Sequence, residues 1–158
     1  MDAISHARSC RDLCERARVA SLGTVARDVP GHPFVTLVTI AFDGKGRALL
    51  LLSRLAEHTA NLEACSHASL LVSEAVDGAG ADPLALGRVT LVGSCGRVPD
   101  GDLEACRKTF LDVHPEASTY AGFADFGFFR LEPEHVRYVG GFGRMSWVDA
   151  KTYADAWK

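Results

Sequence analysis

Short β-rich runs separated by turn residues constrain the fold of this chain more than any other feature of its sequence. Asp28-Val-Pro-Gly-His-Pro33 and Asp43-Gly-Lys-Gly46 are hairpin-type connections between neighbouring runs. Few helical segments interrupt the series. The pattern predicts a closed antiparallel β-barrel and not a doubly wound sheet. The predicted strands are Val19–Val25, Pro33–Phe42, Arg47–Leu52, Ala68–Val76, Gly87–Val98, Phe126–Leu131 and His135–Val139.

Helices are predicted where apolar residues recur at three- and four-residue steps. We interpret Glu132-Pro133-Glu134 as a turn and Asp77–Pro83 as a Gly-rich loop, while Gly93 and Gly96 indicate a bulge or a close backbone approach. We expect one domain over residues 1–158, with helices at 1–18 and 148–158. The predicted helices are Ile4–Arg18, Glu57–Cys65, Asp100–Val113 and Val148–Trp157.

The strand predicted over Pro33–Phe42 is apolar on both faces. A small barrel buries only one face of each strand, so another surface must cover the second face. A homodimer interface is the simplest such cover. One face carries Phe34, Val38, Ile40 and Phe42, and the other carries Val35, Leu37 and Ala41.

Composition excludes several classes of protein. The 158 residues are 47% hydrophobic and 23% charged, which is ordinary for a globular domain, and the net charge of −3 gives no basic footprint for nucleic acid. No apolar run spans a bilayer and the N-terminus has no signal region, so we expect a cytoplasmic protein. The five cysteines match no zinc pattern, and Cys10 and Cys14 are interpreted as buried thiols, so no metal site is expected.

A candidate anion site follows the apolar run Ala48–Leu52. Ser53, Arg54, His58 and Thr59 lie within seven positions where a strand ends and a helix begins. Free N–H groups and the helix dipole favour negative charge at a helix N-terminus, and the phosphate of a cofactor is the expected ligand. In the alternative interpretation Ser53 and Thr59 cap the helix, Arg54 pairs with a surface acid, and His58 is an ordinary surface histidine.

Several segments together resemble a known superfamily. Pro33-Phe-Val-Thr-Leu-Val38, Ser53-Arg-Leu-Ala-Glu-His-Thr-Ala-Asn-Leu62 and Gly87-Arg-Val-Thr-Leu-Val-Gly93 are similar to the pyridoxamine 5′-phosphate oxidase-like, FMN-binding split β-barrels. Tyr138-Val-Gly-Gly-Phe-Gly-Arg144 and Trp147 resemble the haem-utilisation branch of that superfamily. The resemblance implies a mainly β split barrel with flanking helices, forming a homodimer with cofactor at the subunit interface.

The resemblance also implies particular cofactor-binding residues. The phosphate site falls at Ser53, Arg54, His58 and Thr59. Donors that stabilise a reduced flavin would be the backbone N–H groups of Thr36, Leu37 and Val38 or the Arg88 side chain. Trp147 either stacks on a flat cofactor ring or anchors the core. Gly140-Gly-Phe-Gly143 is interpreted as a tight turn after a strand, with Phe142 packed inward.

Departures from the oxidase pattern limit the implied activity. Thr36, His58 and Arg88 stand where the oxidases have arginine, lysine and glutamine, and the vitamin-binding residues near the oxidase C-terminus have no clear counterpart. We therefore expect an FMN-binding flavoprotein, an oxidoreductase whose substrate and catalytic residues the sequence does not name. The alternative is a haem-binding or haem-degrading protein, or a non-catalytic cofactor-binding module. Because no histidine follows His135, the sequence favours FMN over haem.

Overall fold

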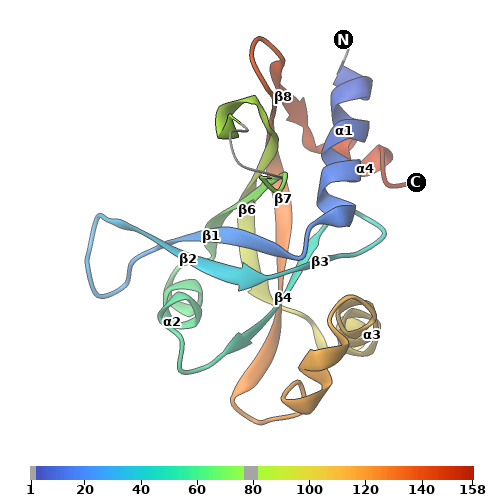
Figure 1. Ribbon diagram of the computed structural model, residues 1–158. Coiled ribbons are helices and arrows are strands. Elements are labelled where there is room, and N and C mark those ends of the chain that lie inside the picture. The colour runs from blue at the N-terminus through green and yellow to red at the C-terminus, as the bar shows by residue number, and fades with distance from the viewer. Residues whose placement is uncertain (1–2, 77–81) are drawn as a thin grey trace.

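The computed structural model describes residues 3–76 and 82–158, so most of the predicted loop Asp77–Pro83 lies outside the described residues. One eight-stranded antiparallel sheet dominates it, flanked by four α-helices and short 3₁₀ turns (Figure 1). The strands are β1 (Val19–Val25), β2 (Pro33–Thr39), β3 (Ala41–Phe42), β4 (Ala48–Ser53), β5 (His67–Ser73), β6 (Gly87–Arg97), β7 (Phe126–Gly140) and β8 (Met145–Asp149). The helical segments are α1 (Ala3–Arg16), α2 (Glu57–Ala64), η1 (Pro83–Ala85), η2 (Asp100–Asp102), α3 (Leu103–Val113), η3 (Pro115–Thr119) and α4 (Ala150–Asp155).

The order of the strands forces the sheet to curl. Hydrogen-bonded neighbours follow the order β2-β1-β5-β6-β7-β4-β3, and β8 pairs with β7. The two ends of this order, β2 and β3, are joined in the chain by the single residue Ile40. A flat sheet would hold its two edges far apart, so the sheet bends until they meet. The result is a mainly β, curled half-barrel with flanking helices, and the predicted fold class is confirmed.

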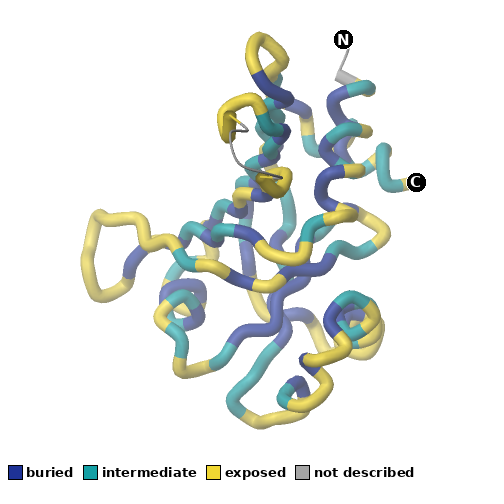
Figure 2. The backbone as a smooth tube through the Cα atoms, viewed as in Figure 1, coloured by how far each residue is buried: buried dark blue, intermediate teal, exposed yellow. Residues whose placement is uncertain are grey.

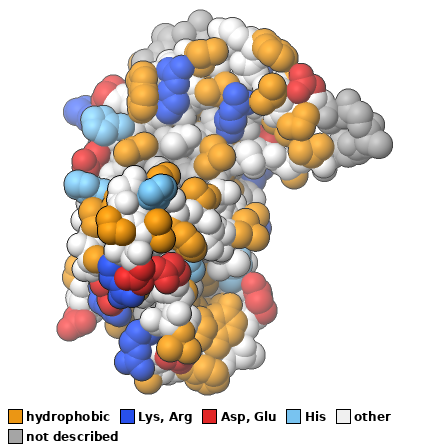
Figure 3. Space-filling model, turned by 90° about the vertical axis from the view of Figure 1, so that its left-hand side faces the viewer, with side chains coloured by type: hydrophobic (Ala, Val, Ile, Leu, Met, Phe, Trp, Pro, Cys, Tyr) orange, Lys and Arg blue, Asp and Glu red, His pale blue; other side chains and the backbone are white. Residues whose placement is uncertain are grey.

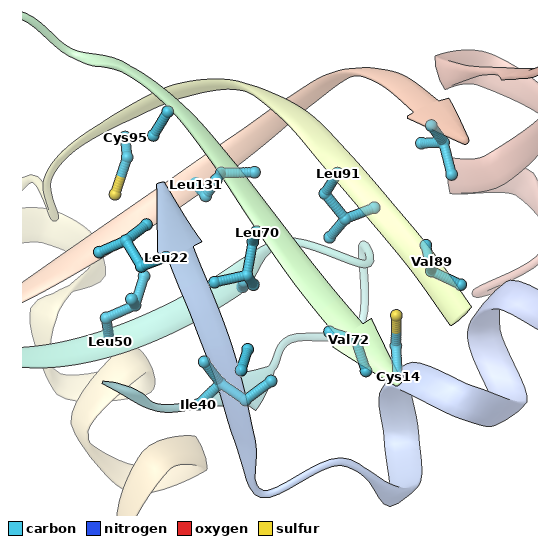
Figure 4. Close-up of a cluster of buried hydrophobic side chains, with 14 of the residues drawn as sticks. Cys14, Leu22, Ile40, Leu50, Leu70, Val72, Val89, Leu91, Cys95 and Leu131 are labelled. Carbon is cyan, nitrogen blue, oxygen red and sulfur yellow. The ribbon is translucent and has the colours of Figure 1, made fainter. Parts of the chain in front are cut away.

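The main core fills the inside of the curled sheet. Inward residues alternate with outward ones, as in β1, where Ala20 and Leu22 are buried. Figure 4 shows Leu22, Leu70, Leu91 and Leu131 pointing toward one another from different strands, and α1 closes one end with Cys14. Burying one such leucine stabilises the fold by about 1.5–3 kcal/mol.

The two cysteines of α1 lie inside this core, as the sequence predicts. Cys10 and Cys14 are fully buried, and burial raises the pKa of the Cys10 thiol to about 12. These thiols are therefore protonated near neutral pH and pack as small apolar groups.

A second core explains the unbroken apolar run of β4. Leu50 and Leu52 point into the barrel, whereas Leu49 and Leu51 pack on the other side with Phe110 of α3. Helix α3 thus covers the outer face of β4 (Figure 1). Figure 2 shows the contrast: buried residues line the barrel interior, and a long exposed stretch runs through the β1–β2 connection into β2.

Four details of the predicted elements are wrong. The strand expected over Pro33–Phe42 is two strands, because the chain changes partner at Ile40. Glu132-Pro133-Glu134 is not a turn but part of the continuous strand β7. The helix expected at 148–158 begins only at Ala150, after strand β8. Phe142 is 76% exposed, at the tip of the β7–β8 turn where that turn extends beyond the barrel.

The glycine prediction holds at Gly93. The register of β6 and β7 shifts between Val92 and Gly93, which leaves Glu134 as the extra residue of a β-bulge. A Cβ atom on Gly93 would overlap the backbone oxygen of Glu132, so only glycine permits this approach. Proline is tolerated at Pro133 because strands accept residues without an N–H at bulges. Gly96 has open space around it and makes no such approach.

Candidate functional site

The turn between β4 and α2 holds the four predicted phosphate residues, and its own backbone uses two of their hydroxyls. The Ser53 hydroxyl accepts a hydrogen bond from the Leu55 N–H at 3.2 Å, and the buried Thr59 hydroxyl donates to the Ser53 carbonyl at 2.6 Å. The Arg54 N–H donates to the Asp125 carbonyl at 2.6 Å. The Ser53 hydroxyl thus satisfies a backbone N–H of the turn, whereas Thr59 lies inside α2 and donates to a carbonyl, so neither side chain caps the helix.

The two cationic residues of this turn differ in charge near neutral pH. The Arg54 side chain is exposed, and none of the hydrogen bonds or ion pairs in the described part of the chain uses its guanidinium. His58 is half-buried, and desolvation lowers the pKa of its imidazole, so it is mainly neutral at pH 7. Ala56 provides no side-chain cap for α2, and Glu57 adds an acid to the first turn. Arg54 is thus the principal positive charge here.

The three predicted residues on β2 point in different directions. Val38 is buried in the barrel, Leu37 is 71% exposed, and Thr36 is half-buried. Strand β2 is hydrogen-bonded only to β1 and forms an edge, so alternate backbone N–H groups point away from its partner. The role of the Thr36, Leu37 and Val38 N–H groups as flavin donors stays a prediction.

Arg88 and Trp147 lie on the outer side of the sheet. The Arg88 guanidinium donates to the carbonyls of Leu84 and Leu86 at 3.2 and 3.3 Å, which holds the segment preceding β6. Trp147 is 63% exposed on β8, so the core-anchor interpretation of this residue is wrong. Its indole instead lies under the Arg137 guanidinium, with 5.5 Å between the guanidinium carbon and the ring centroid.

A single chain does not bring all of these residues together. Ser53 pairs with Phe126 at one end of β7, whereas Trp147 pairs with Arg137 and Arg88 with Val139 near the other end. Val139 is thirteen positions after Phe126 along β7, which is roughly 40 Å for an extended chain. In Figure 1, α2 and β8 accordingly lie at opposite ends of the molecule.

The outer face of the sheet carries a continuous line of paired residues that the sequence analysis did not identify. Directly paired residues point to the same side of an antiparallel sheet. The line, called here the Leu37–Trp147 row, crosses six strands through Leu37, Ser21, Leu71, Thr90, Arg137 and Trp147. A second line two residues along, the Val35–Asp149 row, runs through Val35, Gly23, Ser69, Val92, His135 and Asp149.

These rows expose several large apolar side chains among small polar ones, with Arg137 and His135 at one end. Leu71 is 40% exposed in addition to Leu37 and Trp147. Figure 3 shows one side of the molecule, on which hydrophobic side chains surround Lys or Arg side chains in the upper part, level with the β7–β8 hairpin. His135 and Arg137 alternate with the buried Val136 along β7. Once β7 is recognised as one strand, this alternation is the sequence signal that identifies the cationic end of the two rows.

A groove opens beside the Leu37–Trp147 row. It has a volume of about 800 Å³ and is lined by Leu37, Ser21 and Leu71 of the row together with Arg16 and Arg18 from the end of α1 and the segment that follows it. Both arginines are exposed. The lining also includes Glu74, whose carboxylate accepts a hydrogen bond from the Gly87 N–H at 2.8 Å. The two guanidinium groups beside apolar side chains suit a flat ligand that carries carboxylates or phosphates.

The sequence matches the family model described as CREG, beta-barrel, over residues 1–155. The chain belongs to the CREG β-barrel family. This family lies within the pyridoxamine 5′-phosphate oxidase-like split-barrel superfamily, so the resemblance inferred from the sequence is confirmed. In the described residues, no helix is long and apolar enough to cross a membrane.

Three known proteins are similar to this chain of the CREG β-barrel family. The chloroplast heme oxygenase HOZ of Arabidopsis thaliana is 34% identical over 138 residues, which are 87% of this chain and 41% of that protein. A heme binding protein from Mycobacterium smegmatis is 33% identical with a TM-score of 0.85, covering 98% of this chain and 61% of that one. The chain thus spans less than two thirds of either protein.

The third relative shows the fold alone. A pyridoxinephosphate oxidase family protein from Clostridium acetobutylicum, related to general stress protein 26, is 13% identical with a TM-score of 0.70, over 97% of this chain and 99% of that one.

Proposed function

We propose that this protein binds haem as a homodimer whose two copies bring the outer faces of their sheets together. The observation that carries the proposal is the Leu37–Trp147 row, an exposed apolar surface with a guanidinium and an indole at one end. Two relatives above 30% identity are named for haem, which supports haem over other flat ligands.

The residues on this face match the chemistry of haem. Haem presents a flat apolar ring, two carboxylates and an iron that prefers an imidazole, thiolate, thioether or phenolate ligand. Leu37 and Leu71 provide apolar contact area, and Arg16 and Arg18 are partners for carboxylates in the adjoining groove. The groove volume of about 800 Å³ lies within the roughly 300–1,000 Å³ typical of small-molecule sites.

The protein would bind and orient the haem and exclude water from it. When bound, haem supplies an iron for oxygen or electron chemistry, and the protein tunes that chemistry through the ligand and the polarity around it. Leu37 and Leu71 would cover one side of the ring, and the guanidinium groups would fix the position of its carboxylates. A second copy would cover the other side, since a face this apolar is rarely left in water.

A homodimer would also bring together the predicted cofactor residues, which lie far apart within one chain. The β4–α2 turn and Trp147 lie at opposite ends of β7, so residues from both ends meet at one site only if two chains contribute. A twofold interface places the same surface of each copy against the other and creates two equivalent sites.

Titration with haemin tests this function. We expect saturable binding at one haem per chain, followed by the Soret band, with a dimer in sedimentation. Leu71→Glu should abolish binding, whereas Leu103→Glu, at a leucine of α3 that is likewise 40% exposed, is the matched control and should bind normally. Absence of saturable binding by the wild-type protein, or equal loss in both variants, contradicts the proposal.

FMN is the second candidate, because of the Arg54 guanidinium beside the N-terminus of α2. This arrangement can hold a phosphate even though the Ser53 and Thr59 hydroxyls serve the turn. The protein would then be a flavoprotein oxidoreductase that takes its substrate at the subunit interface. Titration with FMN in place of haemin distinguishes the two, and tighter binding of FMN would favour this second function.

A further inference from the structure

We propose that His135 supplies the imidazole that ligates haem iron, with Trp147 and Arg137 as its positioning neighbours. This inference rests on the proposed haem-binding function. The structure places His135 itself on the exposed outer face.

Two of the six histidines are committed to the interior. His6 is buried with its Nδ1 atom 2.7 Å from the Ser146 hydroxyl. His114 is buried too, with Nε2 2.8 Å from the Ile40 carbonyl and Nδ1 3.2 Å from a Glu116 carboxylate oxygen. Neither imidazole is accessible to a ligand on the outer face.

Two further histidines lie away from this face. His32 sits in the β1–β2 connection with its Nδ1 atom 3.2 Å from the Pro30 carbonyl. His58 is half-buried on α2, in the turn at the far end of β7. The remaining pair, His67 and His135, are exposed on strands, and no hydrogen bond in the described part of the chain uses either ring.

Its surroundings distinguish His135 from His67. The His135 ring meets the Trp147 ring edge-on, with 6.5 Å between centroids and 86° between planes. The Arg137 guanidinium lies over the same indole. An imidazole for iron, a flat ring that can pack beside a porphyrin, and a cation for a carboxylate thus occupy three neighbouring positions on the outer face. His67, at the start of β5, has neither aromatic nor cationic contact in the described residues.

The charged groups around His135 leave its imidazole available. Asp149 is its direct partner on β8, but the Asp149 carboxylate accepts hydrogen bonds from the Thr152 N–H at 2.9 Å and from the Thr152 hydroxyl. Val92, its partner on β6, is apolar. Glu134, the bulge residue, is exposed next to it in the chain. None of these groups forms a hydrogen bond or ion pair with the His135 ring.

Absorption and electron paramagnetic resonance spectra of the haemin-loaded protein test the assignment. His135→Ala should shift the Soret band, change the spin state of the iron and weaken haemin binding by about tenfold or more, since a lost iron ligand costs at least 1.4 kcal/mol or so. Added imidazole should restore the wild-type spectrum. His135→Cys should give a spectrum with thiolate character, which a merely structural residue would not produce. His67→Ala is the matched control and should leave the spectrum unchanged.

The outcomes separate this inference from the function on which it rests. If the wild-type protein binds haemin and His135→Ala keeps its spectrum and affinity, another ligand holds the iron and only the inference is overturned. If His67→Ala changes the spectrum instead, the ligand is His67. If the wild-type protein does not bind haemin, the proposed function itself fails. Circular dichroism of each variant checks the fold, which a substitution at exposed His135 should preserve.

Discussion

Leu131 and Val136 are five residues apart on one continuous strand, yet both are buried in the same core. Strand side chains alternate between faces, so residues separated by an odd number of positions should point in opposite directions. The extra residue at the Val92/Gly93 bulge reverses the alternation between them. The bulge therefore determines that Val136 points inward and that His135 and Arg137 point outward.

Substitution of Gly93 should strongly destabilise this arrangement. In Gly93→Ala the added Cβ meets the Glu132 backbone oxygen, which cannot move without breaking the ladder, so we expect a loss of about 1–3 kcal/mol in the free energy of unfolding. Gly96→Ala, on the same strand with open space around it, should cost nothing and serves as the control. Urea denaturation of both variants measures the difference. Equal stability of the two would show that the bulge tolerates a side chain.

Residue patterns predicted most of the elements but not their connections in space. The alternation in β1 and β5 and the apolar steps of α1 identified those elements within a few residues. Glu132-Pro133-Glu134 has the composition of a turn, and only its pairing with Gly93 shows that β7 continues through it. Likewise, the partner change at Ile40 depends on sheet closure, a long-range property that no local window contains.

The candidate site was predictable only in part, for a similar reason. The β4–α2 turn is local, so Ser53, Arg54, His58 and Thr59 could be recognised together. The outer-face rows combine one residue from each of six strands, and they depend on pairing registers that the sequence does not state. Because β8 was missed, Trp147 had no partner, and Arg137 and His135 remained unnoticed beside it.

A homodimer through the outer face should be sensitive to single charges on the Leu37–Trp147 row. Leu37→Glu places a carboxylate on the apolar surface of each copy, and its desolvation should raise the dimer dissociation constant roughly a hundredfold or more. Leu103→Glu adds the same charge at an exposed leucine of α3, off this row, and should leave the dimer intact. Sedimentation at micromolar concentrations reports both. A wild-type monomer, or dimers in both variants, would contradict this interface.

The lowered pKa of His58 should make the protein less stable in mild acid. Burial holds the pKa of this imidazole in the folded state below its value of about 6.5 in the unfolded chain. The unfolded state therefore binds more protons as the pH falls through that range, and stability decreases from pH ~7.5 to ~5.5. His58→Gln should remove part of this decrease, and His67→Gln, the same change at an exposed histidine, is the control. Thermal melts across this pH range provide the comparison, and parallel pH profiles for wild type and His58→Gln would exclude the effect.

Comparing FMN with riboflavin, which lacks the phosphate, tests whether the β4–α2 turn binds the phosphate or only supports the fold. Arg54 is the main positive charge in the turn, and its guanidinium has no ion pair in the described structure. Arg54→Ala should weaken FMN binding ten- to hundredfold, or about 1.5–3 kcal/mol, and change riboflavin binding little. Arg27→Ala is the control, because Arg27 is an exposed arginine whose guanidinium already pairs with Asp28 at 2.7 Å. Flavin fluorescence titration measures the affinity of each variant for FMN and for riboflavin, relative to the wild-type protein. Equal weakening of both flavins by Arg54→Ala would mean that Arg54 supports the turn and does not hold the phosphate.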